Sequence, residues 1–201
     1  MKIVIIDYGL GNTKSIFNAC KTITDKVIVS KKKKDIENAS HLIFPGVGSF
    51  DYGMKMLKDT NFSHLIVSHF NKNKPILGIC LGLQIFFEKS EEGKIPGLGL
   101  IKGNVIKIKG NLNSKEKIPV IGWREVKMKE LQKNKTQLKT FYFDHSYMVK
   151  PKDEKIIEGF YCIDDEKINS FVKLNNFMGS QFHPEKSGKN GLNIIKKFLN
   201  L

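Results

Sequence analysis

The stretch that decides the fold covers residues 75–84 and reads PILGICLGLQ. It begins with a short apolar run, which is typical of a buried strand. Cys80 then lies between Gly78 and Gly82 in the pattern G-x-C-x-G, the cysteine form of a nucleophile elbow. We expect a sharp strand-to-helix turn at Cys80, because small neighbours let the backbone fold tightly and leave the apical side chain exposed. A helix over residues 81–88 is expected to follow.

The expected position of Cys80 suits a nucleophile. The positive end of the helix that follows would point at the sulfur, which favours thiolate over thiol. The first backbone N–H groups of that helix, such as that of Leu81, have no partner within the helix and can stabilise a developing oxyanion. Taken alone, the motif also fits a buried cysteine with no chemical role. A nucleophilic cysteine needs a base, and the base needs a third group that orients it.

The best candidate for the base is His183, in residues 179–187, which read GSQFHPEKS. Pro184 ends regular strand pairing there. In an extended segment, side chains two residues apart lie on the same side, so the Glu185 carboxylate can accept a hydrogen bond from one ring nitrogen. The other nitrogen then faces the thiol, which gives a Cys–His–Glu relay. His145 also lies in a polar context, whereas three histidines are expected to be structural or exposed: His41, His64 and His69.

A glycine-rich turn is expected at residues 44–50, FPGVGSF, directly after another strand. It departs from both phosphate-binding patterns, G-x-x-x-x-G-K-[ST] and G-x-G-x-x-G. A backbone N–H of Val47 that serves an oxyanion fits this turn better. Because the ends of adjacent parallel strands meet in one crevice, we expect the turn to lie beside Cys80, with the His183 loop as a further candidate neighbour.

The apolar pattern predicts an α/β fold with a mostly parallel central sheet, flanked by helices and extended by antiparallel strands. Strands are expected over residues 2–7, 26–29, 41–44 and 75–79, and helices over residues 13–24, 54–70 (one or two), 81–88 and 191–201. The antiparallel part is expected within residues 98–182, where turn pairs separate short strand patterns at 103–104, 110–111 and 175–176. We expect a single domain over residues 1–201.

The bulk composition is that of an ordinary globular protein, with 201 residues, of which 40% are hydrophobic and 27% charged. No apolar run is long enough to span a bilayer, and Asp7 interrupts the apolar start before it reaches the length of a signal peptide. We therefore expect a cytoplasmic protein without a membrane partner.

Charge and cysteine usage exclude further classes. The net charge of +14 is compatible with nucleic-acid binding, but Arg124 is the only arginine, and arginine is the usual reader of bases and phosphates, so no nucleic-acid partner is expected. The lysine run at residues 31–34 is expected to be a solvated loop or a helix start. Cys20, Cys80 and Cys162 are an odd number without paired spacing, which argues against disulfides and zinc. At least two of the three cysteines are expected to be core residues without a chemical role, and no metal or other cofactor is expected.

Three motifs together resemble the triad-type (class I) glutamine amidotransferases: GICLGLQ at residues 78–84, PGVG at 45–48 and QFHPEKS at 181–187. The resemblance covers essentially the whole chain and implies a flavodoxin-like α/β fold. Within that family, three stretches resemble the glutaminase subunits of imidazole glycerol phosphate synthase, an enzyme of histidine biosynthesis: IDYGLGN at 6–12, PGVGSF at 45–50 and DHSY at 144–147.

The resemblance implies a role for each motif. Cys80 would attack the side-chain amide of glutamine and form a glutamyl thioester, while His183 moves the proton and Glu185 orients His183. Backbone N–H groups of Val47 and Leu81 would form the oxyanion hole, and reshaping of the nearby turn by the partner's ligand is one way to complete it. The amino-acid end of glutamine would be held by Gly46, Gln84, Ser146 and Tyr147.

The implied partner is a (βα)8-barrel cyclase subunit, which would form a heterodimer with this chain and receive its ammonia. Four residues match positions near the family's subunit interface and ammonia gate: Asn12, Trp123, Tyr142 and Lys186. The family usually reads PHMGWN where residues 119–124 read PVIGWR, and has leucine where Thr13 follows Gly-Asn. These departures, which place valine at 120 and arginine at 124, lie away from the triad and bear on the partner.

Other functions remain open at this point. A paralogous glutaminase could supply ammonia to a sugar amidotransferase in surface-polysaccharide or flagellin glycan synthesis. A stand-alone thiol hydrolase or peptidase would share the elbow, but it would not need the combination of Gln84, PGVG and HSY. A non-catalytic binding subunit would be expected to lack a member of the triad.

Overall fold

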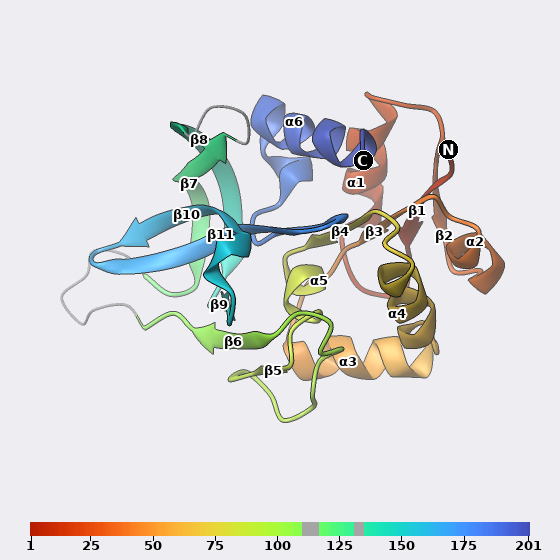
Figure 1. Ribbon diagram of the computed structural model, residues 1–201, viewed down its shortest axis with the longest axis horizontal. Coiled ribbons are helices and arrows are strands. Elements are labelled where there is room, and N and C mark those ends of the chain that lie inside the picture. The colour runs from red at the N-terminus through yellow and green to blue at the C-terminus, as the bar shows by residue number, and fades with distance from the viewer. Residues whose placement is uncertain (110–116, 131–134) are drawn as a thin grey trace.

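The computed structural model describes residues 1–109, 117–130 and 135–201, and a large sheet crosses it (Figure 1). The turn expected at residues 110–111 lies outside the described residues. Within them, the sheet has nine strands in the order β2-β1-β3-β4-β12-β11-β10-β7-β8. These strands are β1 (Ile3–Ile6), β2 (Val27–Ser30), β3 (His41–Phe44), β4 (Ile76–Ile79), β7 (Val120–Glu130), β8 (Lys135–His145), β10 (Ile157–Ile163), β11 (Glu166–Leu174) and β12 (Phe177–Ser180).

The sheet has a parallel half and an antiparallel half, which meet at β12. Strands β2, β1, β3, β4 and β12 are parallel to their neighbours in that order, and we call them the parallel half. Strands β11, β10, β7 and β8 pair antiparallel and form the antiparallel half. A smaller sheet contains β5 (Lys89–Ser90), β6 (Gly103–Lys107) and β9 (Tyr147–Pro151). The mostly parallel α/β fold with an antiparallel extension is therefore confirmed.

Helices cover both faces of the parallel half. They are α1 (Thr13–Lys21), α2 (Lys33–Glu37), α3 (Phe50–Asp59), α4 (Ser63–Asn71), α5 (Leu81–Gln84) and α6 (Gly188–Leu199), with short 3-10 turns η1 (Glu154–Ile156) and η2 (Pro184–Lys186). In Figure 1, α1 and α6 lie on one side of the sheet, and α3 and α4 lie on the other.

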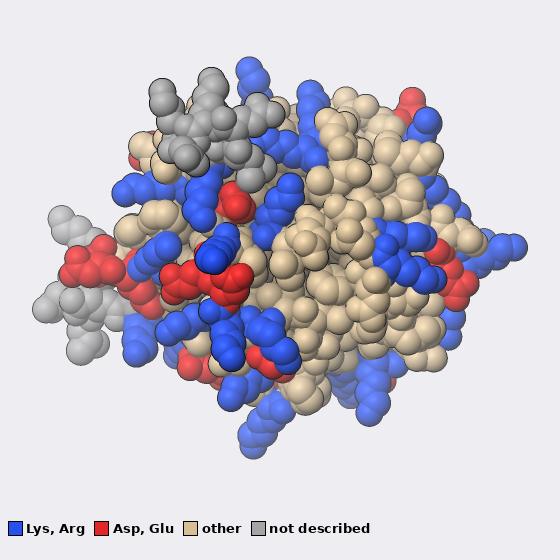
Figure 2. All heavy atoms as spheres, in the orientation of Figure 1, with Lys and Arg blue, Asp and Glu red and all other residues tan. Residues whose placement is uncertain are grey.

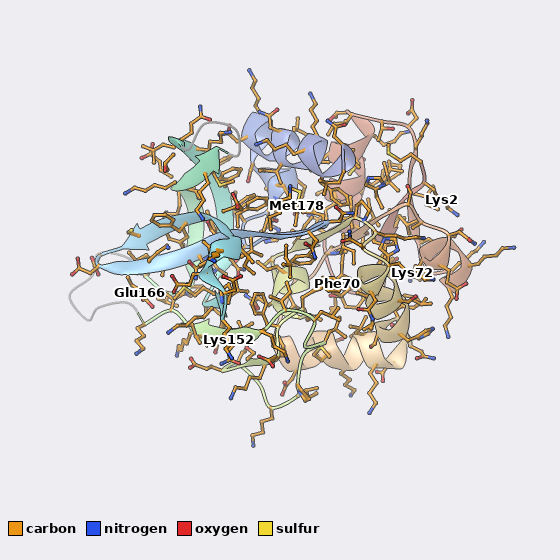
Figure 3. The ribbon with its side chains drawn as sticks, in the orientation of Figure 1. Lys2, Phe70, Lys72, Lys152, Glu166 and Met178 are labelled. Atoms are coloured by element: carbon orange, nitrogen blue, oxygen red, sulfur yellow. The ribbon has the colours of Figure 1, made fainter. Side chains whose placement is uncertain are left out.

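Alternation along the strands builds two hydrophobic layers. Ile3 and Ile5 of β1 pack with the buried residues of α1 and α6, whereas Val4 and Ile6 pack with those of α3 and α4. All four side chains are fully buried, as expected for a parallel strand with helices on both faces. Met178 and Phe70, labelled in Figure 3, belong to these opposite layers.

Several expectations need correction. The helix expected over residues 81–88 ends at Gln84, because the next carbonyls bond elsewhere: Leu98 donates to Ile85, and Ile101 donates to Phe86. The pair at 103–104 begins β6 instead of forming a turn. Cys162 is exposed on β10, so only Cys20 of the two non-elbow cysteines is a core residue.

The surface carries mixed charge. On the face shown in Figure 2, acidic side chains are interspersed among the lysines. The lysine run at residues 31–34 includes the start of α2, in agreement with the expected helix start. In the described part of the chain, none of the helices is both long and apolar enough to cross a bilayer.

Candidate active site

The nucleophile elbow forms where β4 ends. Cys80 has φ 54° and ψ −115°, a conformation that residues other than glycine rarely adopt. Strain of this kind persists only where the surroundings enforce it, and it clusters at functional sites. Here the Cys80 N–H donates to the Ser180 carbonyl at 2.7 Å, and the Cys80 carbonyl accepts from the N–H groups of Leu83 and Gln84. The predicted sharp turn at Cys80 is therefore present.

Two glycines let the elbow pack on the glycine-rich turn after β3. A Cβ on Gly82 would clash with the carbonyl oxygen of Phe44, and a Cβ on Gly46 would lie 2.6 Å from the Gly82 nitrogen. Both clashes involve backbone, which cannot swing away as a flexible side chain does. This close approach holds the turn that contains Val47 beside Cys80, as the sequence predicts.

The Cys80 side chain is more enclosed than the elbow motif predicts. Only 8% of Cys80 is exposed, because the ends of β8 and β12 cover the turn. Its Sγ lies 3.8 Å from the carbonyl oxygen of Asp144, at the end of β8. The Nε2 of Gln181, which follows β12, donates to the sulfur at 3.6 Å. The expectation of an exposed thiol was wrong, since the antiparallel half contributes to the wall around it.

His183 and Glu185 lie just after β12. The His183 Nδ1 is 2.9 Å from Glu185 Oε1, and the two side chains are 4% and 1% exposed. Burial lowers the pKa of His183, but hydrogen bonds with Cys80 and Glu185, together with the charges of those groups, outweigh burial and raise the pKa from 6.5 to about 10. The imidazole is thus held as a cation between a sulfur and a carboxylate, and a neighbouring cation favours thiolate at the cysteine.

Backbone contacts to the antiparallel half fix the His183 loop. The His183 N–H donates to the Tyr142 carbonyl at 2.9 Å. The Ser187 hydroxyl donates to the His183 carbonyl at 2.6 Å and accepts from the Tyr142 N–H at 3.0 Å. The base is therefore positioned by β8 as well as by its own strand, a contribution that sequence spacing does not reveal.

A pocket of about 230 Å³ lies in front of the sulfur, a volume that suits a single amino acid more than a drug-sized ligand. Cys80 and His183 both line it. So do most of the residues expected to bind substrate or oxyanion: Val47, Leu81, Gln84, Ser146 and Tyr147. Gly46 does not line the pocket and lies instead against the elbow backbone.

Four lining or neighbouring groups were not predicted from the motifs. Gln181 and the Asp144 carbonyl contact the sulfur, and Glu92 and Pro119 line the pocket. Gln181 lies in the QFHPEKS stretch, Asp144 in DHSY and Pro119 in PVIGWR, but these motifs gave no sign of the contacts. The approach of all four groups to the elbow depends on tertiary packing.

His145 also lines the pocket, but its chemistry differs from that of His183. Burial lowers its pKa, a hydrogen bond with the Tyr147 carbonyl raises it, and the charges of His183 and Arg124 lower it, with a net change from 6.5 to about 4. Its other ring nitrogen lies 2.9 Å from the Tyr161 hydroxyl. His145 is therefore a neutral, structural histidine. Of the three remaining histidines, His41 and His69 are buried, and His64 is exposed, in agreement with their expected structural or exposed character.

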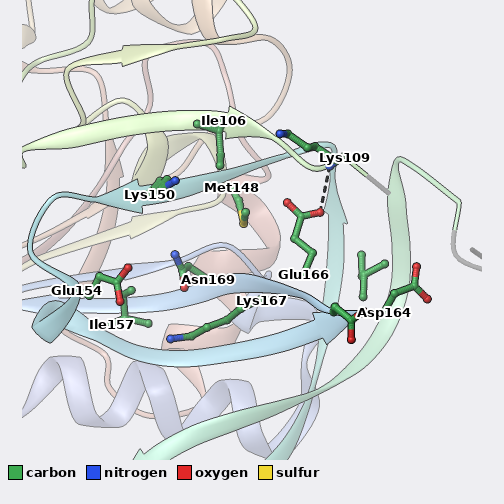
Figure 4. A pocket seen from close by; sticks show the side chains of 12 residues that line it. Ile106, Lys109, Met148, Lys150, Glu154, Ile157, Asp164, Glu166, Lys167 and Asn169 are labelled. Carbon is green, nitrogen blue, oxygen red and sulfur yellow. Dashed lines mark hydrogen bonds between the residues drawn. The ribbon is translucent and has the colours of Figure 1, made fainter. Parts of the chain in front are cut away.

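A larger cavity lies elsewhere, between the smaller sheet and the hairpin of β10 and β11 (Figure 4). Its volume is about 730 Å³, and lysines and acids alternate around it. Glu166 accepts a hydrogen bond from the Lys109 backbone at 3.2 Å, and Asn169 donates to the Val149 carbonyl at 3.0 Å. None of the described residues that line it is cysteine or histidine. Cavity size therefore does not identify the active site.

The residues expected at the partner interface lie in two separate places. Trp123 is 52% exposed and packs edge-on against Tyr142, with ring centroids 6.0 Å apart. The Lys186 Nζ lies 5.3 Å from the centre of the same tyrosine ring, so these three form one cluster. Asn12 is exposed at the start of α1, where its side chain accepts from the Ser15 N–H.

In the described ranges, no group of three or more His, Cys, Asp or Glu side chains is arranged to hold a metal ion. The sulfur, imidazole and carboxylate have the chemistry required of a nucleophile, a base and an orienting group in acyl transfer.

Comparison with known proteins agrees with that chemistry. The family model "Glutamine amidotransferase class-I" matches residues 4–201. The chain belongs to the class-I glutamine amidotransferases. All three motifs that carried the resemblance lie inside the matched range.

Curated members of this glutamine amidotransferase family are similar to the chain over nearly its whole length. "Imidazole glycerol phosphate synthase subunit HisH" of Lactococcus lactis is 41% identical, over 98% of this chain and 98% of that protein. The subunit of the same name from Aquifex aeolicus is 40% identical, over 98% and 96% of the two chains. Among solved structures, "Crystal structure of glutamine amidotransferase" superposes with a TM-score of 0.75 at 17% identity, over 98% of this chain and 97% of that one, which shows a shared fold.

Proposed function

We propose that the chain is the glutaminase subunit of imidazole glycerol phosphate synthase, which releases ammonia from glutamine for histidine biosynthesis. The observation that carries the chemistry is a cysteine at a strained elbow that lines one pocket with a buried histidine, which in turn pairs with a glutamate. The assignment to a pathway is supported by relatives named HisH at about 40% identity over nearly the full chain. Residues 1–201 would act as one glutamine amidotransferase domain in the cytoplasm.

The reaction begins with attack of the Cys80 sulfur on the side-chain carbonyl carbon of glutamine. The carbonyl oxygen gains negative charge in the tetrahedral intermediate, and N–H groups of Val47 and Leu81 stabilise it. The His183 imidazolium gives its proton to the departing nitrogen, so ammonia leaves and a glutamyl thioester remains. His183 then accepts a proton from water, which attacks the thioester and releases glutamate. One glutamine and one water thus become glutamate and ammonia.

The rest of the pocket holds the amino-acid end of glutamine. Ser146 and Tyr147 lie on its wall, and Gly46 contributes backbone close to the elbow. The Gln84 Nε2 already donates to the Tyr147 carbonyl and to Gln181, so the Gln84 Oε1 is the atom available to an amino group. The pocket therefore offers the polar groups that an amino acid needs beside the thiol.

Ammonia would pass to a cyclase subunit of (βα)8-barrel type in a heterodimer. The exposed cluster of Trp123, Tyr142 and Lys186 would lie at that interface, because exposed aromatic side chains are typical anchors of protein partners. Its connection to the His183 loop through Tyr142 gives a route by which the partner can influence the base. Asn12 would contact the same partner from the start of α1.

The decisive experiment measures glutamine hydrolysis by the purified chain alone and after addition of a cyclase subunit with its ligand. We expect slow hydrolysis by the chain alone and strong activation by the histidine-pathway cyclase. High activity of the isolated chain would contradict the coupling. Activation by a glycan-pathway sugar amidotransferase, and not by the cyclase, would instead support the paralogous function.

A further inference from the structure

A chain of hydrogen bonds with defined donors and acceptors connects the Cys80 sulfur to the Tyr147 carbonyl. Gln84 Nε2 donates to the Tyr147 carbonyl at 3.2 Å and to the Oε1 of Gln181 at 3.0 Å. Gln181 Nε2 then donates to Cys80 Sγ at 3.6 Å. Both glutamines are buried, with exposed fractions of 5% for Gln84 and 0% for Gln181. The chain therefore runs from a backbone carbonyl to the sulfur through two enclosed amides.

The carbonyl at the start fixes the orientation of both amides. A backbone carbonyl can only accept, so Gln84 must turn its NH2 group toward Tyr147. The second hydrogen of that NH2 group needs an acceptor, so Gln181 must present its Oε1 to Gln84. The NH2 group of Gln181 is then left on the side of the sulfur. If the Gln181 amide were flipped, its NH2 group would face the NH2 group of Gln84, so two donors would meet. Its carbonyl oxygen would then face the Cys80 sulfur.

We propose that Gln181 is a positioning residue of the active site, whose amide N–H is directed at Cys80 by Gln84 and stabilises the thiolate. The proposal rests on the proposed role of Cys80 as nucleophile. A hydrogen bond to an ionised sulfur is stronger than one to a neutral thiol or thioester, because it is charge-assisted. Burial increases this difference, since water does not compete for the amide. Gln181 therefore supports the charged forms of the cycle, before attack and as the thiolate leaves the thioester.

The same geometry gives Gln84 a second function. In addition to facing the substrate pocket, it sets the polarity of Gln181 without contact to the sulfur. Loss of the Gln84 amide lets Gln181 rotate, so that its carbonyl and its NH2 group both sample the sulfur side. The effect of Gln84 on the thiolate must then pass through Gln181.

The test measures the rate of Cys80 alkylation by iodoacetamide against pH, on the full chain and with quantification by peptide mass spectrometry. A Cys162→Ser background removes the exposed thiol, and Cys20 is protected because burial raises its pKa to about 12. We expect Gln181→Met to slow alkylation at neutral pH about tenfold and to move the midpoint of the pH profile upward by about one unit. Gln84→Met is expected to shift the profile in the same direction by a smaller amount.

The double variant separates the relay from simple packing. If Gln84 acts through Gln181, Gln84→Met/Gln181→Met should react no more slowly than Gln181→Met alone. Additive losses, or an unchanged midpoint in folded Gln181→Met, would overturn the proposal. If Gln181→Met does not fold, an unchanged midpoint in Gln84→Met overturns it. The exposed Gln137 provides the matched control, Gln137→Met, for which no shift is expected.

Failure of the nucleophile assignment has a different signature. In that case the Cys80 thiol of the protein without the glutamine substitutions would react no faster than Cys162 does in the natural chain. Steady-state kinetics of the complex add a second readout, because a relay that stabilises the thiolate predicts that Gln181→Met lowers kcat more than it raises the KM for glutamine.

Discussion

The parallel and antiparallel halves of the large sheet contribute to the site in different ways. The parallel half holds Cys80 by contacts between backbones, so that neither Gly46 nor Gly82 tolerates an added Cβ. The antiparallel half leaves large apolar side chains uncovered, with Trp123 52% exposed and Ile121 58% exposed. The proposed nucleophile thus lies where backbones pack closely, and the surface suited to a partner lies where strands expose one face.

The two halves meet at the His183 loop. It follows the last parallel strand, yet its backbone bonds to Tyr142 of the antiparallel half. Tyr142 also carries the contacts with Trp123 and Lys186. The comparison teaches that the base belongs to both halves, which gives a partner on the antiparallel face a physical connection to the chemistry.

Removal of the nucleophile should have the largest effect. Cys80→Ala is expected to abolish glutamine hydrolysis, with a loss of at least about 10⁴-fold, because no other group in the pocket can form the thioester. The melting temperature should change little, which thermal unfolding can check. Cys162→Ala, at the exposed cysteine of the antiparallel half, is the control and should retain full activity. Turnover that survives Cys80→Ala would end the nucleophile assignment.

Removal of the base comes next. His183→Ala is expected to lower kcat about 1,000-fold or more, because neither thiolate formation nor protonation of the leaving ammonia is then assisted. A loss of kcat below tenfold, measured at saturating glutamine, would point to another base. The His183 loop would then have no direct role in the chemistry.

Replacement of a glycine that packs against the parallel half should lower stability. Gly82→Ala places a Cβ against the carbonyl oxygen of Phe44, so we expect the free energy of unfolding to fall by about 3 kcal/mol or more. Urea denaturation gives this value. Gly99→Ala is a useful comparison, because Gly99 has open space around its Cβ position but a positive φ of 63°, and so reports strain without a clash. Equal losses in the two variants would argue against the tight backbone contact.

A substitution on the exposed face of the antiparallel half should affect binding of the partner and leave the stability of the isolated chain nearly unchanged. Trp123→Ala is expected to weaken binding of the cyclase subunit about tenfold or more, as an exposed aromatic anchor is lost, while stability of the isolated chain stays within about 0.5 kcal/mol. Isothermal titration of the two subunits measures the change. Val29→Ala alters an exposed apolar residue of the parallel half, 38% exposed, and should leave binding unchanged. Equal effects of both variants would remove the distinction between the halves.

The smallest effects concern pH and two of the buried histidines, His145 and His183. The folded-state pKa of His145 is lowered to about 4, so its stabilising contribution is present above its unfolded pKa, near 6.5, and is lost as pH falls toward 4. The pKa of His183 is raised to about 10, so its contribution is present below pH 6.5 and is lost as pH rises toward 10. His145→Gln should therefore flatten the acidic side of a plot of unfolding free energy against pH. His183→Gln should flatten the alkaline side of the same plot. If both variants flatten the same side of that plot, the opposite pKa shifts given to the two histidines would be contradicted.

The parallel half was predictable from sequence because its signals are local. Strand β3 spans His41–Phe44, as expected, since a short apolar run followed by Pro-Gly has few alternatives. The roles proposed for Cys80, His183 and Glu185 could be predicted because each residue lies in a short motif, and the motif order places them at neighbouring strand ends.

The errors arose where tertiary contacts override local signals. Gly103 looked like a turn residue, but it begins β6, where an added Cβ would clash with the Lys150 carbonyl. Cys162 looked like a core residue because cysteines usually are, yet strand alternation in β10 turns it outward. The contact of Gln181 with the sulfur depends on two buried amides far apart in sequence, which no spacing rule contains.

The most direct test of the central claim is to look for the covalent intermediate. The complex with its cyclase subunit is quenched in acid during steady turnover of glutamine, and its peptides are analysed by mass spectrometry. We predict a glutamyl thioester on the peptide that carries Cys80, and its absence in Cys80→Ala. A complex that turns over glutamine at full rate without any adduct on that cysteine, or with the adduct on Cys162, would contradict the account.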